Sequence, residues 1–277
     1  MKNLFVTGGT GFVGRHFIKE ALKKGYFIYA TSRKKIKNKK NIKWLKGDFS
    51  HNWKRQLKNS HILIHFASAG VYNKNLSYDY IFNINVVKSL KLLINAINAG
   101  CKKLIIIGSC SENIFERNVN KLNIYNNNNN LNYALSKFLF SSLAAIIAKK
   151  FRCECHIMKL FQVYGYGEKK SRLWTSLVNA AKKGNNLNLS IGYQKRDFIS
   201  ISDAVKLIIN SLQKFNKNSK NYVSYSHIAT GNNITVKEFS QKIWKEMKAR
   251  GRLNFGKLKN ADYLDYLSKK KLILKYN

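Results

Sequence analysis

Three side chains in this sequence have the types and spacing needed to transfer a proton at a carbon that bears oxygen. Tyr133 and Lys137 stand four residues apart, so a helix would place both on one face. A tyrosine phenol has a pKa of about 10, which is too high for a good base at neutral pH. A neighbouring ammonium group lowers that pKa because it stabilises the phenolate. Tyrosine and lysine are both common in this chain, so the weight of the pair depends on its position.

A predicted buried strand upstream of Tyr133 ends in hydroxyl groups. Residues 104–107 form a continuous apolar run, and Ser109 and Ser111 follow it closely. Ligands of an open parallel sheet gather at the carboxyl ends of its strands. We therefore expect Ser109, and in second place Ser111, to share a crevice with Tyr133 and to hydrogen-bond the reacting oxygen. Capping of the next segment is the alternative role for either hydroxyl.

The first predicted strand, residues 4–7, leads into a glycine-rich turn and then into a helical pattern. Glycine accepts unusual backbone angles, lets a pyrophosphate approach the main chain and allows close helix packing. The helix N-terminus adds unpaired N–H groups and a partial positive charge. The turn therefore predicts a dinucleotide site. The residues that we assign to it are Gly8, Gly11, Phe12, Val13 and Gly14.

The end of the second predicted strand distinguishes the two nicotinamide cofactors. NAD-binding chains usually carry an acid there that holds the ribose 2′-hydroxyl, whereas a 2′-phosphate needs cations. This chain has Ser32 and Arg33 and no acid at that point. The sequence therefore favours NADP, with NAD as the alternative, and assigns Ser32 and Arg33 to the 2′-phosphate.

Short apolar runs alternate with helical patterns along the first 160 residues. The runs are continuous and rich in β-branched residues, which is typical of strands buried on both faces of a parallel sheet. The predicted strands are residues 4–7, 27–31, 62–66, 104–107 and 156–160, and the predicted helices are 15–24, 78–99 and 131–150. This alternation predicts an α/β fold with a Rossmann-type doubly wound parallel sheet.

The second half of the chain is less regular. Helical patterns at 172–183 and 236–250 fall outside the main sheet, while a helix at 203–214 and a strand at 222–228 return to it. We therefore expect a smaller C-terminal substrate-binding lobe built from interleaved segments. The predicted NADP-binding Rossmann domain takes residues 1–165 with returning segments around 199–231, and the lobe takes 166–198 and 232–277.

The charge balance of the chain is strongly basic, with 51 Lys and Arg against 13 Asp and Glu and a net charge of +38. Such a field attracts polyanions, so a nucleic-acid-binding protein on a degenerate dehydrogenase scaffold is a distant alternative to an enzyme. The lysines are spread over the whole length, however, and no RNP, zinc-finger or helix-turn-helix pattern accompanies them. We expect no specific nucleic-acid partner.

Cysteine usage and hydropathy indicate a cytoplasmic protein. The four cysteines show no paired CxxC spacing, which is typical of reduced cytosolic thiols. The histidines are scattered, and we predict no metal. The N-terminal apolar run is too short for a secretory signal. No apolar stretch approaches the roughly 20 residues that a membrane helix needs, so we expect no membrane insertion.

In their order along the chain, these motifs resemble the extended short-chain dehydrogenase/reductase superfamily, and within it the nucleotide-sugar epimerase, dehydratase and reductase branch. The resemblance runs from Thr7 to about Gly231. Residues 159–167 are similar to the segment that passes the nicotinamide and opens the substrate lobe. Residues 196–203 are similar to a segment whose arginine lies near the nucleotide diphosphate of the sugar donor. A guanidinium fork suits such a group physically.

The resemblance assigns roles to further residues of this chain. It makes Ser109, Tyr133 and Lys137 the catalytic group, with Tyr133 and Lys137 also in contact with the cofactor and Lys137 on the nicotinamide ribose. The other cofactor residues that it implies are Asp48 at the adenine, Phe49, Ala67, Ser68, Ala69, Asn85, Phe161 and Val163. The substrate residues that it implies are Ser111, Gln162, Arg172 and Arg196. It also implies a homodimer formed through the helices at 78–99 and 131–150.

Departures from the family patterns narrow the expected reaction. In the 4,6-dehydratases an Asp-Glu pair follows the catalytic hydroxyl, whereas Glu112 stands one place later here. The epimerase-reductases that act at C3 and C5 carry a cysteine where this chain has Ser111. We therefore predict an NADP-dependent reductase of a nucleotide-linked 4-keto sugar, such as the 4-keto-6-deoxy-hexoses of surface polysaccharides, with Tyr133 as the proton donor. An NAD-dependent nucleotide-sugar C4 epimerase is the alternative.

Overall fold

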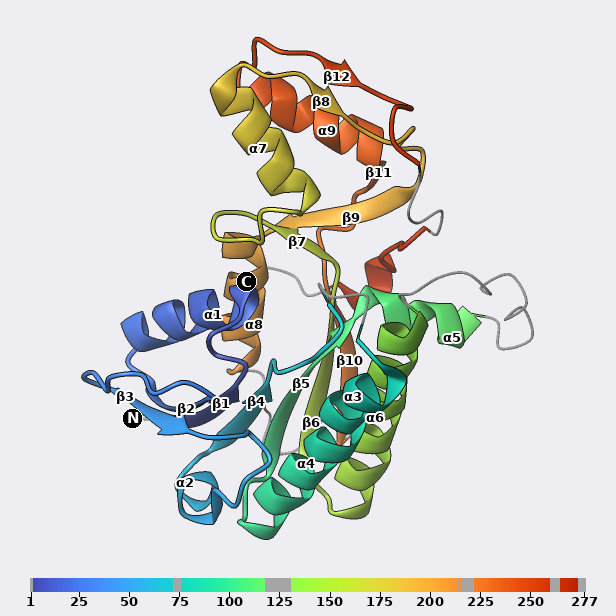
Figure 1. Cartoon of the computed structure of the whole chain (residues 1–277). Helices are drawn as coiled ribbons and strands as arrows, with labels where there is room; N and C mark the ends of the chain where they lie inside the picture. Colours follow the sequence, from blue (N-terminus) through green and yellow to red (C-terminus); the bar gives the residue numbers. More distant parts are fainter. Residues whose placement is uncertain are drawn as a thin grey trace. The chain divides into compact units, whose positions relative to one another are not determined.

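Seven strands form one sheet in the order β10-β6-β5-β4-β1-β2-β3 (Figure 1). The computed structural model describes residues 2–71, 76–117, 131–213, 215, 222–259 and 265–273. The strands are β1 (Asn3–Thr7), β2 (Phe27–Ser32), β3 (Ile42–Lys46), β4 (Ile62–His65), β5 (Lys103–Ser109), β6 (Glu154–Leu160) and β10 (Val223–Ile228). β1 pairs in parallel with β2 and with β4, β2 with β3, and β4 with β5. This order confirms the predicted doubly wound sheet, whose direction of winding reverses between β1 and β4.

The described chain divides into two compact units. The first comprises the described residues of Met1–Lys159 and Val205–Ser226, and the second comprises those of Leu160–Ala204 and His227–Lys275. The first unit carries most of the sheet together with the glycine-rich turn, Ser109, Tyr133 and Lys137. The reacting groups predicted from the sequence therefore all lie within one unit.

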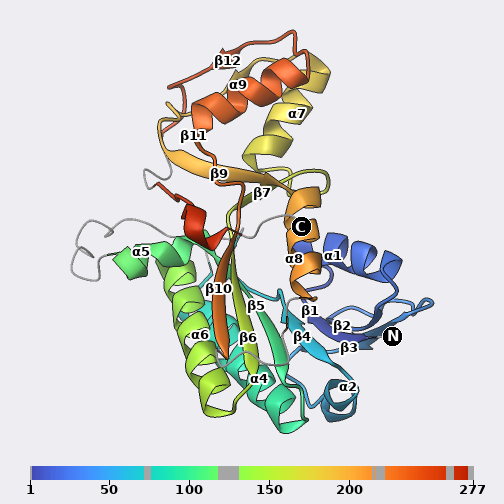
Figure 2. The same cartoon turned by 180° about the vertical axis from the view of Figure 1, so that it is seen from behind.

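Helices cover both faces of the sheet of the first unit (Figures 1 and 2). α1 (Phe12–Lys23) and α8 (Ile201–Ser211) lie on one face, while α3 (Tyr78–Phe82), α4 (Ser89–Asn98) and α6 (Leu131–Lys150) lie on the other. A π-helical segment, η1 (Asn83–Lys88), joins α3 to α4, and the short α2 (Lys54–Lys58) follows β3. Leu92 of α4 and Phe140 of α6 pack in one cluster with Phe5 of β1 and Leu104 of β5. Burial of such side chains on both faces explains why the strands are continuously apolar.

The two long helical segments correct one statement made from the sequence. Tyr78–Asn98 and Leu131–Lys150 are each long and apolar enough to cross a membrane, judged by length and composition alone. The sequence was expected to contain no stretch of that kind, and that expectation was wrong. In the first unit, Leu92 and Phe140 from these segments are almost fully buried against the sheet, as in the core helix of a globular protein.

The edge strand β3 was not predicted from the sequence. Along it, Ile42 is buried while Lys43 and Lys46 are exposed. An edge strand with one solvated face alternates apolar and charged residues, whereas β4 is apolar over Ile62–Ile64 and β5 over Leu104–Ile107. The lysines of this segment interrupt the continuous apolar pattern by which the other strands were predicted, and for this reason β3 was missed.

The second unit contains a three-stranded sheet in the order β11-β9-β7 and a two-stranded sheet of β8 and β12. Their bounds are β7 (Gln162–Tyr164), β8 (Leu187–Asn188), β9 (Lys195–Ser200), β11 (Asn233–Thr235) and β12 (Leu253–Asn254). The helices are α7 (Leu173–Lys183), α9 (Val236–Glu246) and the 3-10 helix η4 (Lys270–Leu272). Leu177, Phe239 and Ile243 form the core of this unit, and the rings of Phe198 and Phe239 stack with their centroids 3.7 Å apart.

Candidate active site

The turn between β1 and α1 closes around positions where a side chain would not fit. Gly8 has a φ of +68°, and a Cβ there would lie 2.6 Å from the backbone nitrogen of Ala67. A Cβ at Gly14 would lie 2.3 Å from the carbonyl oxygen of Gly8. No side chain caps α1 at Gly11, so the first N–H groups of the helix are available for hydrogen bonds from outside it. This cradle fits the pyrophosphate of a dinucleotide.

The end of β2 brings a hydroxyl and a guanidinium group to the same strand tip. Ser32 is buried, its Oγ accepts a hydrogen bond from the backbone nitrogen of Lys34 at 3.2 Å, and its carbonyl accepts one from Gly47 at 2.8 Å. Arg33 is exposed. No acid stands at this tip, so its charge suits a phosphate better than an unmodified ribose.

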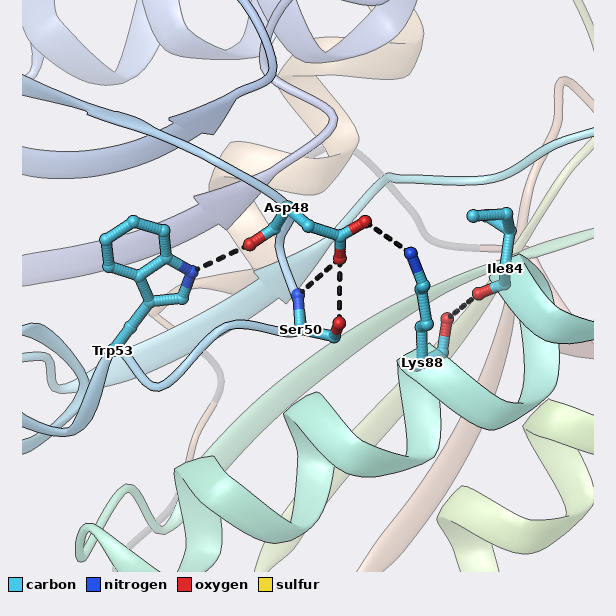
Figure 3. Close-up of polar contacts among 6 residues, drawn as sticks. Asp48, Ser50, Trp53, Ile84 and Lys88 are labelled. Carbon is cyan, nitrogen blue, oxygen red and sulfur yellow. Dashed lines mark hydrogen bonds and ion pairs between the residues drawn. The ribbon is translucent and has the colours of Figure 1, made fainter.

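Asp48 follows β3 and is ordered by three hydrogen bonds (Figure 3). Its Oδ1 accepts from the backbone nitrogen and from the hydroxyl of Ser50, at 2.9 and 2.8 Å. Its Oδ2 lies 2.6 Å from Nζ of Lys88, which reaches over from η1. Partial burial acts to raise the pKa of Asp48, but the bonds from Lys88 and Ser50 outweigh it and hold the pKa at about 2. Lys88 could not be recognised from the sequence, because its partner lies 40 residues away.

A buried histidine fixes the strands behind the cofactor turn. Nδ1 of His65 lies 2.7 Å from Oγ1 of Thr7, and Nε2 lies 2.9 Å from Oγ of Ser89. Burial, assisted by the charge of Lys137, lowers the pKa of His65 to about 3, so the ring is neutral. The ring of Phe49 packs edge-on against it at 5.3 Å. His65 is thus a structural link between β1, β4 and α4.

Asn85 connects the cofactor loop to the helix that carries Tyr133. Its Oδ1 accepts from the backbone nitrogen of Ala69 at 2.7 Å, and its Nδ2 donates to the Ala69 carbonyl at 3.0 Å and to Ser136 Oγ at 2.9 Å. Ala69 follows Ser68 in the segment after β4, and Ser136 lies on α6. The residue that the resemblance assigned to the cofactor therefore holds both walls of the site. π-helical segments such as η1 are frequent at functional sites.

The structure brings the predicted catalytic hydroxyls together. Oγ of Ser109 lies 2.8 Å from Oγ of Ser111. The side chains of Ser109 and Ser68 both hydrogen-bond the phenol of Tyr133, which is partly buried. Lys137, also buried, donates from Nζ to the carbonyl of Ile107 at 2.6 Å. Ser109, Tyr133 and Ser68 therefore share one small polar site at the tip of β5.

The pKa of Tyr133 departs from the expectation made from the sequence. A lowered value was expected from the neighbouring Lys137, and that expectation was wrong. Burial raises the pKa of Tyr133 above its ordinary value, and the hydrogen bonds from Ser109 and Ser68 offset only part of this increase. Burial also lowers the pKa of Lys137. In this arrangement the phenol holds its proton at neutral pH.

The turn after β5 uses Ser109 as a helix cap as well. Its Oγ accepts a hydrogen bond from the backbone nitrogen of Ser111 at 3.2 Å, at the start of the 3-10 helix η2 (Cys110–Glu112), which leads into α5 (Asn113–Arg117). Oε1 of Glu112 accepts from the backbone nitrogen of Ser109 at 2.7 Å and completes a capping box. The alternative role considered for Ser109 is thus present, and the pattern Ser-x-x-Glu could have located Glu112.

In the second unit, two of the predicted substrate residues lie together. Arg172 donates from Nη2 to Oε1 of Gln162 at 3.2 Å, and its Nε lies 3.1 Å from Oε1 of Glu168. Val163, the next residue of β7, is buried, and the ring of Phe161 packs against His227 with the centroids 4.8 Å apart. Gln162 and Arg172 therefore form one polar group beside buried apolar neighbours.

Arg196 lies elsewhere in the second unit and is buried. Its guanidinium carbon lies 4.4 Å from the ring centre of Tyr266, and Nη1 donates to the carbonyl of Lys195 at 2.8 Å. The adjacent Asp197 was not singled out from the sequence. Its carboxylate accepts hydrogen bonds from the backbone nitrogens of Thr230 and Gly231 at 2.8 and 2.7 Å, and it anchors β9 to that turn.

Metal ligands and disulfides contribute nothing to either group of residues. Within the described ranges, no cluster of three or more His, Cys, Asp or Glu side chains could hold a metal ion. None of the four cysteines is in a disulfide, and all four are buried. Burial raises the pKa of Cys101 to about 11 and that of Cys155 to about 12, so neither is a reactive thiolate.

The sequence matches the NAD dependent epimerase/dehydratase family over residues 4–224, which is most of the chain. The chain belongs to this family. Membership confirms the resemblance to the extended short-chain dehydrogenase/reductases and the prediction that the protein is an enzyme of that type. It agrees with the sheet order and with the glycine cradle.

Two relatives and one solved structure align over most of this chain. CDP-abequose synthase of Salmonella muenchen is 26% identical over 268 residues, which cover 94% of this chain and 86% of that protein. UDP-glucose 4-epimerase of Vibrio cholerae is 27% identical over 221 residues, which cover 76% and 66%. The solved structure of MoeE5 in complex with UDP-glucuronic acid and NAD superposes with a TM-score of 0.79 at 20% identity, over 98% of this chain and 91% of that one. The structural likeness concerns the fold.

Proposed function

We propose that this protein is an NADP-dependent reductase of a nucleotide-linked 4-keto sugar, of the 6-deoxy kind used in surface polysaccharides. The observation that carries the proposal is the phenol of Tyr133, which is protonated at neutral pH and hydrogen-bonds the side chains of Ser109 and Ser68. Reduction of a carbonyl needs a proton donor, whereas oxidation of an alcohol needs a base. The family member with the widest alignment reported above is named for the synthesis of a CDP-linked sugar.

Most of the residues that we assign to the cofactor belong to the first unit, at or after the ends of its strands. The glycine turn would hold the pyrophosphate, Ser32 and Arg33 the 2′-phosphate, and Asp48 the adenine. Lys137 would hold the nicotinamide ribose. The other residues of the first unit that the family resemblance assigns to the cofactor are Phe49, Ala67, Ser68, Ala69 and Asn85, and it assigns Phe161 and Val163 as well. When bound, NADPH supplies the hydride that adds to C4 of the sugar.

The residues of this chain supply the proton and hold the reacting oxygen. Tyr133 gives its phenolic proton to the oxygen at C4 as that oxygen gains negative charge, and the O–H bond of the phenol breaks as the new one forms. Ser109 donates a hydrogen bond to the same oxygen, and its contact with Ser111 fixes the direction of its hydroxyl. The ammonium of Lys137 stabilises the phenolate that remains, and a proton from solvent restores the phenol.

We assign the charged part of the substrate to polar groups of the second unit and to Ser111. Arg172 and Arg196 present guanidinium groups, which suit the oxygens of a diphosphate. Gln162 is held by Arg172 and would bind a sugar hydroxyl. Ser111 would contact the sugar close to C4.

The reaction is tested by incubating the purified protein with NADPH and a panel of nucleotide-linked 4-keto sugars. We expect loss of the NADPH absorbance with at least one of these sugars. In Tyr133→Phe we expect the rate of this loss to fall by a factor of about 10²–10⁴. The matched control is Tyr26→Phe, because Tyr26 precedes β2 at the opposite end of the sheet. Absence of any sugar-dependent oxidation of NADPH, or a Tyr133→Phe variant as fast as wild type, would overturn the proposal.

A C4 epimerase is the second candidate, since UDP-glucose 4-epimerases are among the similar proteins. Such an enzyme oxidises and re-reduces the same carbon with a cofactor that stays bound. NAD recovered from the purified protein, together with interconversion of two C4 epimers without added cofactor, would favour this function over reduction.

The proposal includes a cytoplasmic homodimer joined through α3, η1, α4 and α6. Tyr80, Val87 and Ile94 are exposed at intervals of seven residues along the first three elements, and Ile146 is exposed on α6. The exposed fractions of Val87 and Ile146 are 60% and 63%, which is high for apolar residues in the middle of long helices. Pairing of this face with its copy would remove these side chains from water.

A further inference from the structure

Glu112 is a fully buried carboxylate inside the catalytic turn, and the reaction described above makes no use of it. Its Oε1 completes the cap on Ser109, but its Oε2 has no hydrogen-bond donor. Capping requires only one oxygen and works equally well at an exposed helix end. Burying the second oxygen is therefore unfavourable and needs another explanation.

One buried ammonium group pairs with this carboxylate, and a second acts on it through its charge. Nζ of Lys159, on β6, lies 3.8 Å from Oε2 of Glu112 and donates to Oδ1 of Asn113 at 3.2 Å. Lys137, on α6, interacts with the same carboxylate through its charge. Lys137 and Lys159 are each about 3% exposed, so water screens neither of them strongly. The cluster, defined as Glu112, Lys137 and Lys159, combines one negative and two positive charges.

The backbone is shaped to admit this carboxylate. Gly108 lies in β5, one residue before Ser109. A Cβ at Gly108 would lie 2.7 Å from Oε1 of Glu112. Any other residue there would push the carboxylate away from the Ser109 nitrogen. Glycine at position 108, just before the catalytic hydroxyl of Ser109, thus leaves room for the side chain of Glu112 to fold back against the end of β5.

We propose that Glu112 is a positioning residue for the reduction: it fixes the Ser109 turn and balances the charges of Lys137 and Lys159, so that Tyr133 keeps its proton until the substrate oxygen becomes negative. This inference rests on the proposed function, which it deepens by naming what sets the direction of proton transfer. Without the carboxylate, the positive charges of Lys137 and Lys159 would favour a tyrosinate, which is a base.

The charges around Glu112 and Tyr133 support this assignment. Burial raises the pKa of Glu112, and the charges of Lys159 and Lys137 and the Ser109 N–H lower it. The groups that act on Tyr133 besides burial are Ser109 and Ser68, which lower its pKa, and Glu112 and Cys110, which raise it. Glu112 also raises the pKa of Lys137. The carboxylate therefore helps both neighbours to stay protonated.

The test follows Tyr133 directly by NMR of protein labelled at the tyrosine ζ-carbon, with the Tyr133 signal assigned from Tyr133→Phe. The variant is Glu112→Gln, which keeps an acceptor for the Ser109 N–H and removes the charge. We expect the midpoint of wild-type Tyr133 to lie above the ordinary tyrosine value of about 10, and the midpoint of the variant to lie at least about one pH unit below that of wild type. Glu20→Gln on the exposed face of α1 is the matched control and should leave the titration unchanged.

A double variant, Glu112→Gln with Lys159→Met, separates charge from shape. It returns the cluster to its original net charge, so the midpoint should move back towards wild type. If the single variant does not fold, the double variant still tests the proposal. A Tyr133 midpoint below that of wild type in the double variant would overturn it. An unchanged Tyr133 titration in folded Glu112→Gln, judged by circular dichroism, would overturn it as well.

The titration needs no substrate, so it is independent of the proposed function. A lowered midpoint in Glu112→Gln without reduction of any keto sugar would overturn the reductase and leave the charge balance in place. Where a keto sugar is reduced, the high-pH limb of kcat should move to lower pH in Glu112→Gln by the shift that the titration shows. A pH profile that does not move would overturn the role of Glu112 in the reaction.

Discussion

Nζ of Lys88 lies 2.6 Å from Oδ2 of Asp48 and joins the π-helical segment η1 to the loop after β3 (Figure 3). With Ser50 on its other oxygen, the carboxylate of Asp48 is fixed by the protein alone. A group that is already ordered loses less entropy when it binds a ligand. Lys88 therefore prepares the position that the sequence assigns to the adenine.

Replacing Lys88 should destabilise the protein in a pH-dependent way. Lys88→Met raises the pKa of Asp48 from about 2 towards its ordinary value. A depressed pKa contributes stability above the unfolded value of about 3.9, and this contribution is lost as the pH falls towards the folded value. The melting temperature of Lys88→Met should therefore lie below wild type near neutral pH, with a difference that shrinks below about pH 4.

The measurement is thermal unfolding of both proteins from about pH 7 down to the lowest pH at which they fold. Lys91→Met, an exposed lysine on α4, is the matched control and should show no such pH dependence. A deficit that stays constant over the whole range would show that Lys88 acts through packing and not through the charge of Asp48.

The choice between NADP and NAD should depend on the tip of β2. Arg33→Ala removes the cation proposed for the 2′-phosphate, and Ser32→Asp adds an acid that repels it. A hydrogen bond to a charged group contributes about 1.5–3 kcal/mol, so each change should weaken NADPH binding about tenfold or more, with little loss for NADH. Titration calorimetry with both cofactors measures this, and Lys37→Ala is the exposed control. Equal losses for the two cofactors would contradict the assignment.

A methyl group at Gly14 should damage the cofactor cradle. In Gly14→Ala the new carbon meets the backbone oxygen of Gly8 at 2.3 Å, and backbone cannot move aside as a side chain can. Overpacking of this kind costs about 1–3 kcal/mol, and we expect a lower melting temperature together with loss of cofactor binding. Gly25→Ala is the control: its φ of +79° makes alanine strained and should also lower the melting temperature, but a Cβ there has nothing within 4 Å, so cofactor binding should be kept. Cofactor affinity as high in Gly14→Ala as in Gly25→Ala would refute the cradle.

The exposed apolar face of the long helices should control assembly. Val87→Glu or Ile146→Glu would place a carboxylate in the proposed dimer contact, where its burial is unfavourable. We expect a mass of one chain for either variant and of two for wild type by light scattering after gel filtration. Leu258→Glu changes an equally exposed leucine of the second unit and should leave the dimer intact. A wild-type protein of one chain at micromolar concentration would contradict the prediction.

Most of the first unit could be predicted because its signals are local in sequence. Continuous apolar runs between helical patterns mark β1, β2, β4, β5 and β6, and the glycine spacing marks the turn before α1. β3 was not predicted, because an edge strand needs only one apolar face and the lysines of β3 are typical of a loop. The pattern of a strand depends on its place in the sheet, which a single sequence does not state.

The candidate site shows the same division between local and distant signals. The pair Tyr133 and Lys137 could be found from spacing alone, but the raised pKa of Tyr133 follows from burial, which spacing does not report. Lys88 and Lys159 were missed because their acids, Asp48 and Glu112, lie about 40 residues or more away in the chain. Only the capping pattern of Ser109 and Glu112 offered a local clue, and it indicated a helix end, not a charge balance.

The segment η1 has one further consequence. Within four consecutive residues it places Asn85 on the loop that holds Ala69 and Lys88 on the loop that holds Asp48. This one short segment therefore holds both the loop that we propose for the nicotinamide end of the cofactor and the loop that we propose for its adenine end. An insertion or deletion in η1 that changes the position of one loop must therefore also change the position of the other. Through this part of the chain, cofactor affinity and reactivity cannot be adjusted separately.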